Sequence, residues 1–168
     1  MKRKKTATKP IRAPEELVAA YAKEAAPLER RGHRGPEQLP AGAEIMKLDT
    51  AGKVLAVVAC YAEIEAQASR SFGTRIMLGL LATTLLRSKL PLTEGQLRIM
   101  TEHASRSRGP AWGPCDWDWA LVKTLARLPG APNRQFKDAI QALTERRGTG
   151  YAIDRKIAAE CKKLLDRR

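Results

Sequence analysis

The chain has 168 residues and a formal net charge of +13, and 43% of its residues are hydrophobic. This apolar content excludes a wholly disordered chain, and a body of about 150 residues is long enough for one self-sufficient core. Only 5% of the residues are aromatic, and alanine and leucine carry most of the apolar content, which favours helices over sheets.

The N-terminus is a basic arm. Such a block of like charge repels itself and stays solvated, so residues 1–13 are expected to be disordered. The start resembles the charged head of a signal peptide, but prolines and acids follow where an apolar segment would be needed. We therefore expect no secretion and an arm that is available to a polyanion. The positively charged residues of the arm, with no acidic residue among them, are Lys2, Arg3, Lys4, Lys5, Lys9 and Arg12.

The first helical signal follows the arm. Pro14 with Glu15 and Glu16 is typical of a first helical turn, because proline fits there and acids complement the positive end of the helix dipole. Apolar residues then recur at helical spacing as far as Pro27. Residues 27–43 contain three prolines and three glycines, so we expect a flexible loop there.

Two apolar helices are predicted next, over about 50–69 and 72–89. The first carries one apolar stripe, and the second is apolar on most faces and is our candidate for the centre of the core. The uncharged residues 76–86 of the second helix are far fewer than the roughly 20 that a membrane-spanning helix needs. We therefore expect a buried core helix and no membrane span.

The C-terminal half shows three helix starts. Thr93 with Gln96 three positions later forms a capping box. Asp116 and Asn133 are candidate N-caps for two further helices. The predicted helices run over about 93–106, 116–128 and 133–147, with a last one from 151 or 154 to 166.

Residues 90–168 can be divided into two helix pairs. The stretch from Leu90–Thr93 through Trp117–Trp119 to Lys156–Ala159 resembles the helix pairs of HEAT-type repeats. This resemblance implies a scaffold or binding surface and no catalytic residue. We thus predict an all-α single domain over 14–168, with six or seven helices arranged as a helical bundle or as a short HEAT-like solenoid. At an offset of 36 residues, the apolar positions of two predicted helices align: Trp117, Leu121, Leu125 and Leu128 with Ile153, Ile157, Cys161 and Leu164.

All three tryptophans lie in the loop 109–119, as Trp112, Trp117 and Trp119. The last two are two positions apart, so on a helix they point about 200° apart and cannot both enter one core. One interpretation is an aromatic platform for a nucleobase or for a partner's side chain. The other is a lid that closes the core, which is a common use of large aromatic side chains.

The sequence contains little that predicts catalysis. Three cysteines without close spacing favour a reducing, cytoplasmic location, and Cys60 and Cys161 are expected to be ordinary core thiols. No closely spaced Cys or His ligands, P-loop or GxSxG pattern occurs, so we predict no metal site, no cofactor and no catalytic residue. Cys115 with His103 is the only pair that could serve as nucleophile and base.

The leading functional prediction is non-enzymatic binding of nucleic acid, DNA or RNA, with little sequence specificity. Lysine and arginine contact phosphates without reading bases, and no predicted helix has a cluster of base-reading side chains. The alternative is a protein–protein adaptor or scaffold that uses the tryptophan loop, and an enzyme with a Cys/His site ranks third. The positive charge would also attract an acidic protein partner. Outside the arm, the candidate phosphate contacts are Arg30, Arg31, Arg34, Arg106 and Arg108.

Overall fold

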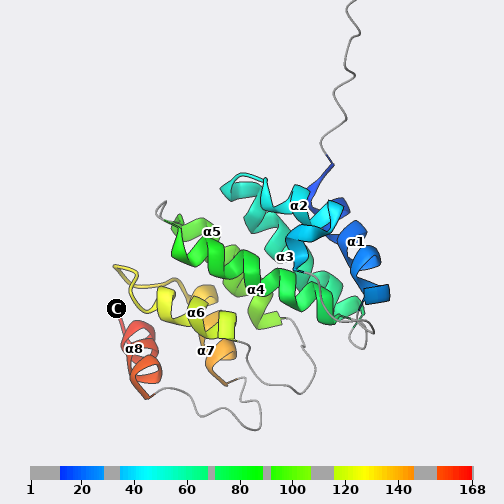
Figure 1. Cartoon of the computed structure of the whole chain (residues 1–168). Helices are drawn as coiled ribbons and strands as arrows, with labels where there is room; N and C mark the ends of the chain where they lie inside the picture. The colour runs from blue at the N-terminus through cyan, green and yellow to red at the C-terminus, as the bar shows by residue number, and fades with distance from the viewer. Residues whose placement is uncertain are drawn as a thin grey trace, which may run out of the picture.

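The computed structural model describes residues 12–28, 35–67, 71–88, 92–106, 116–145 and 155–167 of the chain. These residues form eight α-helices and two short 3₁₀ turns and contain no strand (Figure 1). The prediction of an all-α domain is therefore confirmed.

The N-terminal part consists of short helical elements around one long helix. Helix α1 (Pro14–Ala25) begins with the predicted proline and ends in the 3₁₀ turn η1 (Ala26–Leu28). A second 3₁₀ turn, η2 (Pro36–Gln38), precedes helix α2 (Pro40–Met46). Both α1 and α2 pack against α3 (Thr50–Ala66).

The expectation of a flexible loop over 27–43 requires a correction in its second half, where η2 and the start of α2 lie. Pro36 and Pro40 each occupy the first turn of a helical element, a position where proline is favoured because its missing N–H has no helical partner to lose. The backbone N–H of Ala41 in α2 donates to Glu24 Oε2 of α1 at 3.1 Å. Glu24 lies 17 positions before Ala41, so the local sequence did not indicate this hydrogen bond at the start of α2.

Helices α3 and α4 (Phe72–Arg87) share the centre of the core. Helix α3 packs against α1, α4 and α5 (Glu94–Arg106), while α4 also contacts α1 and α6 (Asp116–Leu125). The hydroxyl of Tyr21 in α1 is fully buried and donates to the carbonyl of Gly73 in α4 at 3.0 Å. The predicted core helix is therefore central, together with α3.

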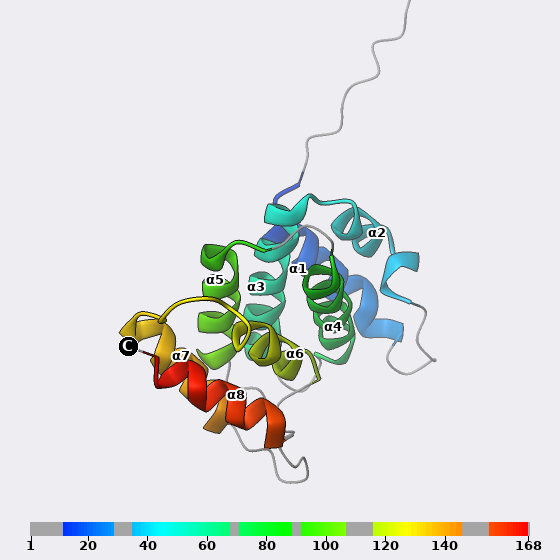
Figure 2. The same ribbon diagram turned by 90° about the vertical axis from the view of Figure 1, so that its left-hand side faces the viewer.

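The C-terminal part adds α7 (Arg134–Glu145) and α8 (Arg155–Leu165) below the central helices in the view of Figure 2. Helix α7 packs mainly against α5, and α8 packs against both α6 and α7. The buried side chains Leu121, Phe136 and Leu164 join this part to the single core cluster that begins in α1.

Two predicted helix caps are confirmed. The backbone N–H of Thr93 donates to Gln96 Oε1 at 2.9 Å, and the N–H of Gln96 donates to Thr93 Oγ1 at 3.2 Å. These reciprocal bonds form the capping box of α5. At the start of α7, the N–H of Phe136 donates to Asn133 Oδ1 at 2.8 Å.

Candidate nucleic-acid interface

The structure places two of the predicted phosphate contacts, Arg12 and Arg106. Among the tryptophans, Trp117 and Trp119 belong to α6 by their backbone, while their side chains and the whole of Trp112 are outside what the structure describes. The predicted phosphate contacts outside the described residues are Lys2, Arg3, Lys4, Lys5, Lys9, Arg30, Arg31, Arg34 and Arg108.

Arg12 lies where the arm meets the folded body. Its Nη2 is 2.8 Å from Glu44 Oε1 of α2, and the two side chains are 34% and 41% exposed. An ion pair with this exposure contributes at most about 1 kcal/mol, because water screens both charges. The pair links Arg12 to α2, and Glu44 neutralises much of the charge that Arg12 would offer to a phosphate.

Arg106 is exposed in the last turn of α5. A cation at this position complements the negative end of the helix dipole, which gives it a structural role as well as a surface charge. His103 is half-buried on the same helix. Its predicted partner Cys115 is outside the described residues, so the Cys/His pair stays a prediction.

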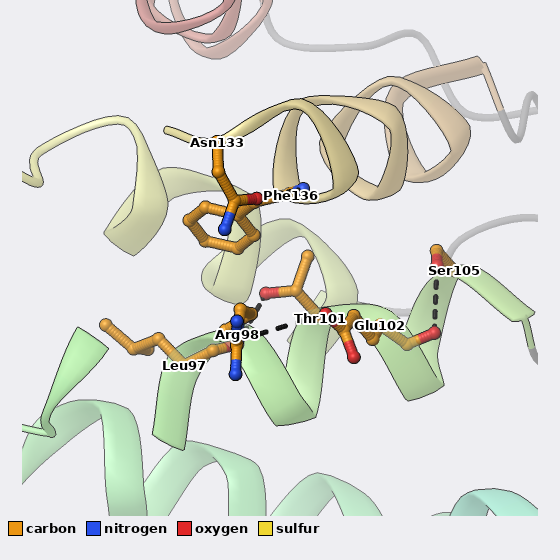
Figure 3. A network of polar contacts seen from close by, with 7 residues as sticks. All are labelled: Leu97, Arg98, Thr101, Glu102, Ser105, Asn133 and Phe136. Atoms are coloured by element: carbon orange, nitrogen blue, oxygen red, sulfur yellow. Dashed lines mark hydrogen bonds and ion pairs between the residues drawn. The ribbon is translucent and has the colours of Figure 1, made fainter. Parts of the chain in front are cut away.

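Several polar groups of α5 make local contacts, as Figure 3 shows beside the start of α7. The Thr101 hydroxyl is buried and donates to the carbonyl of Leu97 at 2.6 Å, and the Ser105 hydroxyl donates to the carbonyl of Glu102 at 2.8 Å. Arg98 Nε lies 3.9 Å from Glu102 Oε1. Both hydroxyls are therefore used in hydrogen bonds to backbone carbonyls of the same helix.

Asp118 has a structural role that the sequence reasoning missed. It is 5% exposed in the first turn of α6, and its Oδ1 accepts a hydrogen bond from the hydroxyl of Tyr61 in α3 at 2.7 Å. The signal in the sequence was its spacing: Asp118, Val122 and Leu125 are four and three positions apart and so share one helix face. A buried hydrogen-bonded carboxylate therefore fixes α6 against α3.

The two described cysteines are core residues, as predicted. Cys60 in α3 and Cys161 in α8 are buried, and neither forms a disulfide within the described residues. Burial raises the pKa of the Cys60 thiol, and the nearby carboxylate of Glu63 raises it further. A thiol held in its protonated form is a poor nucleophile, so neither chemistry nor metal binding is expected at Cys60. In the described ranges, no three His, Cys, Asp or Glu side chains group as a metal ion would require.

The net positive charge is unevenly divided along the chain. The first 12 residues contain six Lys and Arg and no acidic residue. The other 156 residues contain 25 Lys and Arg against 18 Asp and Glu, a net charge of +7. Nearly half of the net positive charge therefore lies in the first 12 residues.

The part of the chain that the structure describes has no helix with the length and apolar character needed to cross a membrane. The chain matches no protein-family model, no curated protein and no solved structure. The similarity to HEAT-type repeats accordingly remains a prediction from the sequence.

Proposed function

We propose that this protein binds nucleic acid without enzymatic activity, through phosphate contacts and with little sequence specificity. The observation that supports the proposal is the N-terminal run of cations: Lys2, Arg3, Lys4, Lys5 and Lys9 come before the first acidic residue of the chain, Glu15. A protein whose excess charge served solubility alone would not need that charge concentrated in so few residues.

The physical basis is counterion release. Each cation that neutralises a phosphate of a duplex frees condensed counterions, and this entropic gain needs no fixed geometry. A basic segment can therefore bind a phosphate backbone while the folded body keeps its own structure. Because phosphates are the same at every base pair, such contacts give affinity without reading sequence.

The folded body gives this arm a defined origin. Arg12 is held by Glu44 on α2, so the arm is attached to the surface formed by α1 and α2. The five cations before Arg12 carry no acidic neighbour in the sequence. We infer that these five, Lys2, Arg3, Lys4, Lys5 and Lys9, make the principal phosphate contacts.

A salt-titrated binding experiment tests this proposal. The triple variant Arg3→Gln, Lys4→Gln, Lys5→Gln removes three arm charges from the full chain. We expect the slope of log K against log salt on a DNA duplex to become less steep by about 2–3, because each lost phosphate contact changes it by about 0.9.

The matched control is Lys23→Gln, Lys47→Gln, Arg87→Gln, which removes three exposed charges from α1, the end of α2 and α4. The control should change the slope much less than the arm variant. Equal slopes for the two variants, or a wild-type protein that does not bind duplex at low salt, would refute the proposal.

A further inference from the structure

The end of α8 is attached to the turn that joins α6 to α7. Arg167 donates through Nη1 to the carbonyl of Leu128 and, at 3.3 Å, to the carbonyl of Gly130. The ammonium group of Lys137 in α7 donates to the carbonyl of Arg167 at 2.8 Å. These contacts bring three helices together, and with them several positively charged side chains.

Three further cations lie within a few positions of this attachment along the chain. Arg127 precedes Leu128 in the turn, Arg134 is the first residue of α7, and Lys163 lies one helical turn before Arg167 on α8. All three are exposed. Within the described part of the chain, no acidic side chain forms an ion pair with any of them. We call Arg127, Arg134, Lys137, Lys163 and Arg167 the basic corner.

Cations outnumber acidic residues in the part of the chain that forms the basic corner. The described residues 116–145 and 155–167 contain nine Lys and Arg with six Asp and Glu, one of which is the buried Asp118. Asp138 and Asp166 are exposed. The described residues between 12 and 106 have the opposite balance, with eight Lys and Arg and ten Asp and Glu. Positive charge in the described body is thus concentrated at its C-terminal end.

The basic corner is far from the origin of the arm. In both views α8 lies at one end of the body, while α2, which holds Arg12 through Glu44, lies at the other (Figures 1 and 2). The corner is therefore not a continuation of the surface from which the arm leaves.

We propose that the basic corner is a second phosphate-binding surface for duplex nucleic acid, separate from the N-terminal arm. This inference rests on the proposed function and adds phosphate contacts from α7, α8 and the turn before α7. Arg167 and Lys137 keep their charges while they hydrogen-bond to carbonyls, so they hold the corner together and contribute to its field. Arg127, Arg134 and Lys163 make the direct phosphate contacts, because their charged groups are exposed and unpaired within the described residues.

The test uses the full chain with Arg127→Gln, Arg134→Gln, Lys163→Gln, and the control is again Lys23→Gln, Lys47→Gln, Arg87→Gln. Both variants lose three exposed charges, so they differ only in where the charge was. Fluorescence anisotropy with a short labelled DNA duplex gives the salt slope of each. The corner variant should lower the slope by about 2–3, and the control should lower it much less.

Equal slopes for the corner variant and the control would overturn this inference and leave the proposed function standing, provided that the wild type still binds in a salt-dependent way. A wild type without salt-dependent binding would overturn both. A second measurement needs no substitution: acetylation of Lys163 in the wild type should slow severalfold when duplex is bound, while acetylation of Lys23 and Lys47 should not. Equal acetylation rates for Lys163 with and without duplex would also contradict the proposal.

Discussion

Gly42→Ala should destabilise this protein, although alanine is normally the better helix former. Gly42 is buried in the middle of α2, and a Cβ atom there would lie 1.9 Å from the carbonyl oxygen of Pro36 and 2.8 Å from its carbonyl carbon. Non-bonded carbon and oxygen atoms need more than 3 Å, so η2 or α2 would have to move by about 1 Å or more. The affected carbonyl of Pro36 also accepts the backbone N–H of Leu39 at 3.2 Å.

The expected magnitude follows from opposing terms. Replacing glycine by alanine inside a helix gains about 1 kcal/mol. Overpacking a well-filled site costs about 1–3 kcal/mol, and weakening one hydrogen bond costs about 1 kcal/mol more. We expect the free energy of unfolding to fall by about 1–3 kcal/mol, which for a protein of this size lowers Tm by roughly 3–10 °C.

The assay is thermal and urea unfolding followed by circular dichroism, with Gly95→Ala as the matched control. Gly95 lies in the first turn of α5, and the nearest atom to its added Cβ would be Thr93 Oγ1 at 3.9 Å, an ordinary contact. The control should leave Tm unchanged or raise it slightly. If Gly42→Ala is as stable as wild type or more so, the close packing of η2 on α2 is wrong.

Three further predictions concern the core and its helix ends. Tyr61→Phe removes the hydroxyl that donates to the buried Asp118, and the free energy of unfolding in urea should fall by about 1.5–3 kcal/mol; a change below about 0.5 kcal/mol would mean that the bond is unimportant. Asn133→Ala should lower the free energy of unfolding by about 1 kcal/mol, because it removes the cap of α7. Asn133→Ser should lower it much less, because serine also caps helices. Equal losses for the two variants would contradict the cap. Burial raises the pKa of the Cys60 thiol, so above pH about 9 the unfolded chain loses this proton while the folded chain keeps it. Stability should therefore fall as pH rises, by up to about 1.4 kcal/mol per pH unit, and Cys60→Ala should reduce that slope in urea titrations at several pH values; an identical slope would contradict the assignment.

Local patterns predicted the helices and several of their ends. The Thr93–Gln96 capping box and the Asn133 cap each involve residues three positions apart, so the sequence alone contains both partners. Helix α2 was missed because Pro36 and Pro40 resemble loop residues unless a helical turn is known to begin at each of them. The sequence around a proline does not by itself distinguish a proline that starts a helix from one that ends the preceding helix.

Contacts between distant segments could not be predicted in this way. Arg12 and Glu44 are 32 positions apart, and Tyr61 and Asp118 are 57 positions apart. Their pairing depends on how α1, α2, α3 and α6 pack, which periodicity does not determine. The basic corner was likewise hidden, because Lys137 and Arg167 come together only through the docking of α8 on α7 and on the turn before it.

The central claim is that the N-terminal cations bind phosphate, and the most direct measurement compares the full chain with a chain lacking residues 1–11. Both retain Arg12 and the described body, while the shorter chain loses five cations and no acidic residue. On a DNA duplex, the slope of log K against log salt should be less steep by about 4–5 for the shorter chain, since each phosphate contact contributes about 0.9. Indistinguishable slopes for the two proteins would contradict the account.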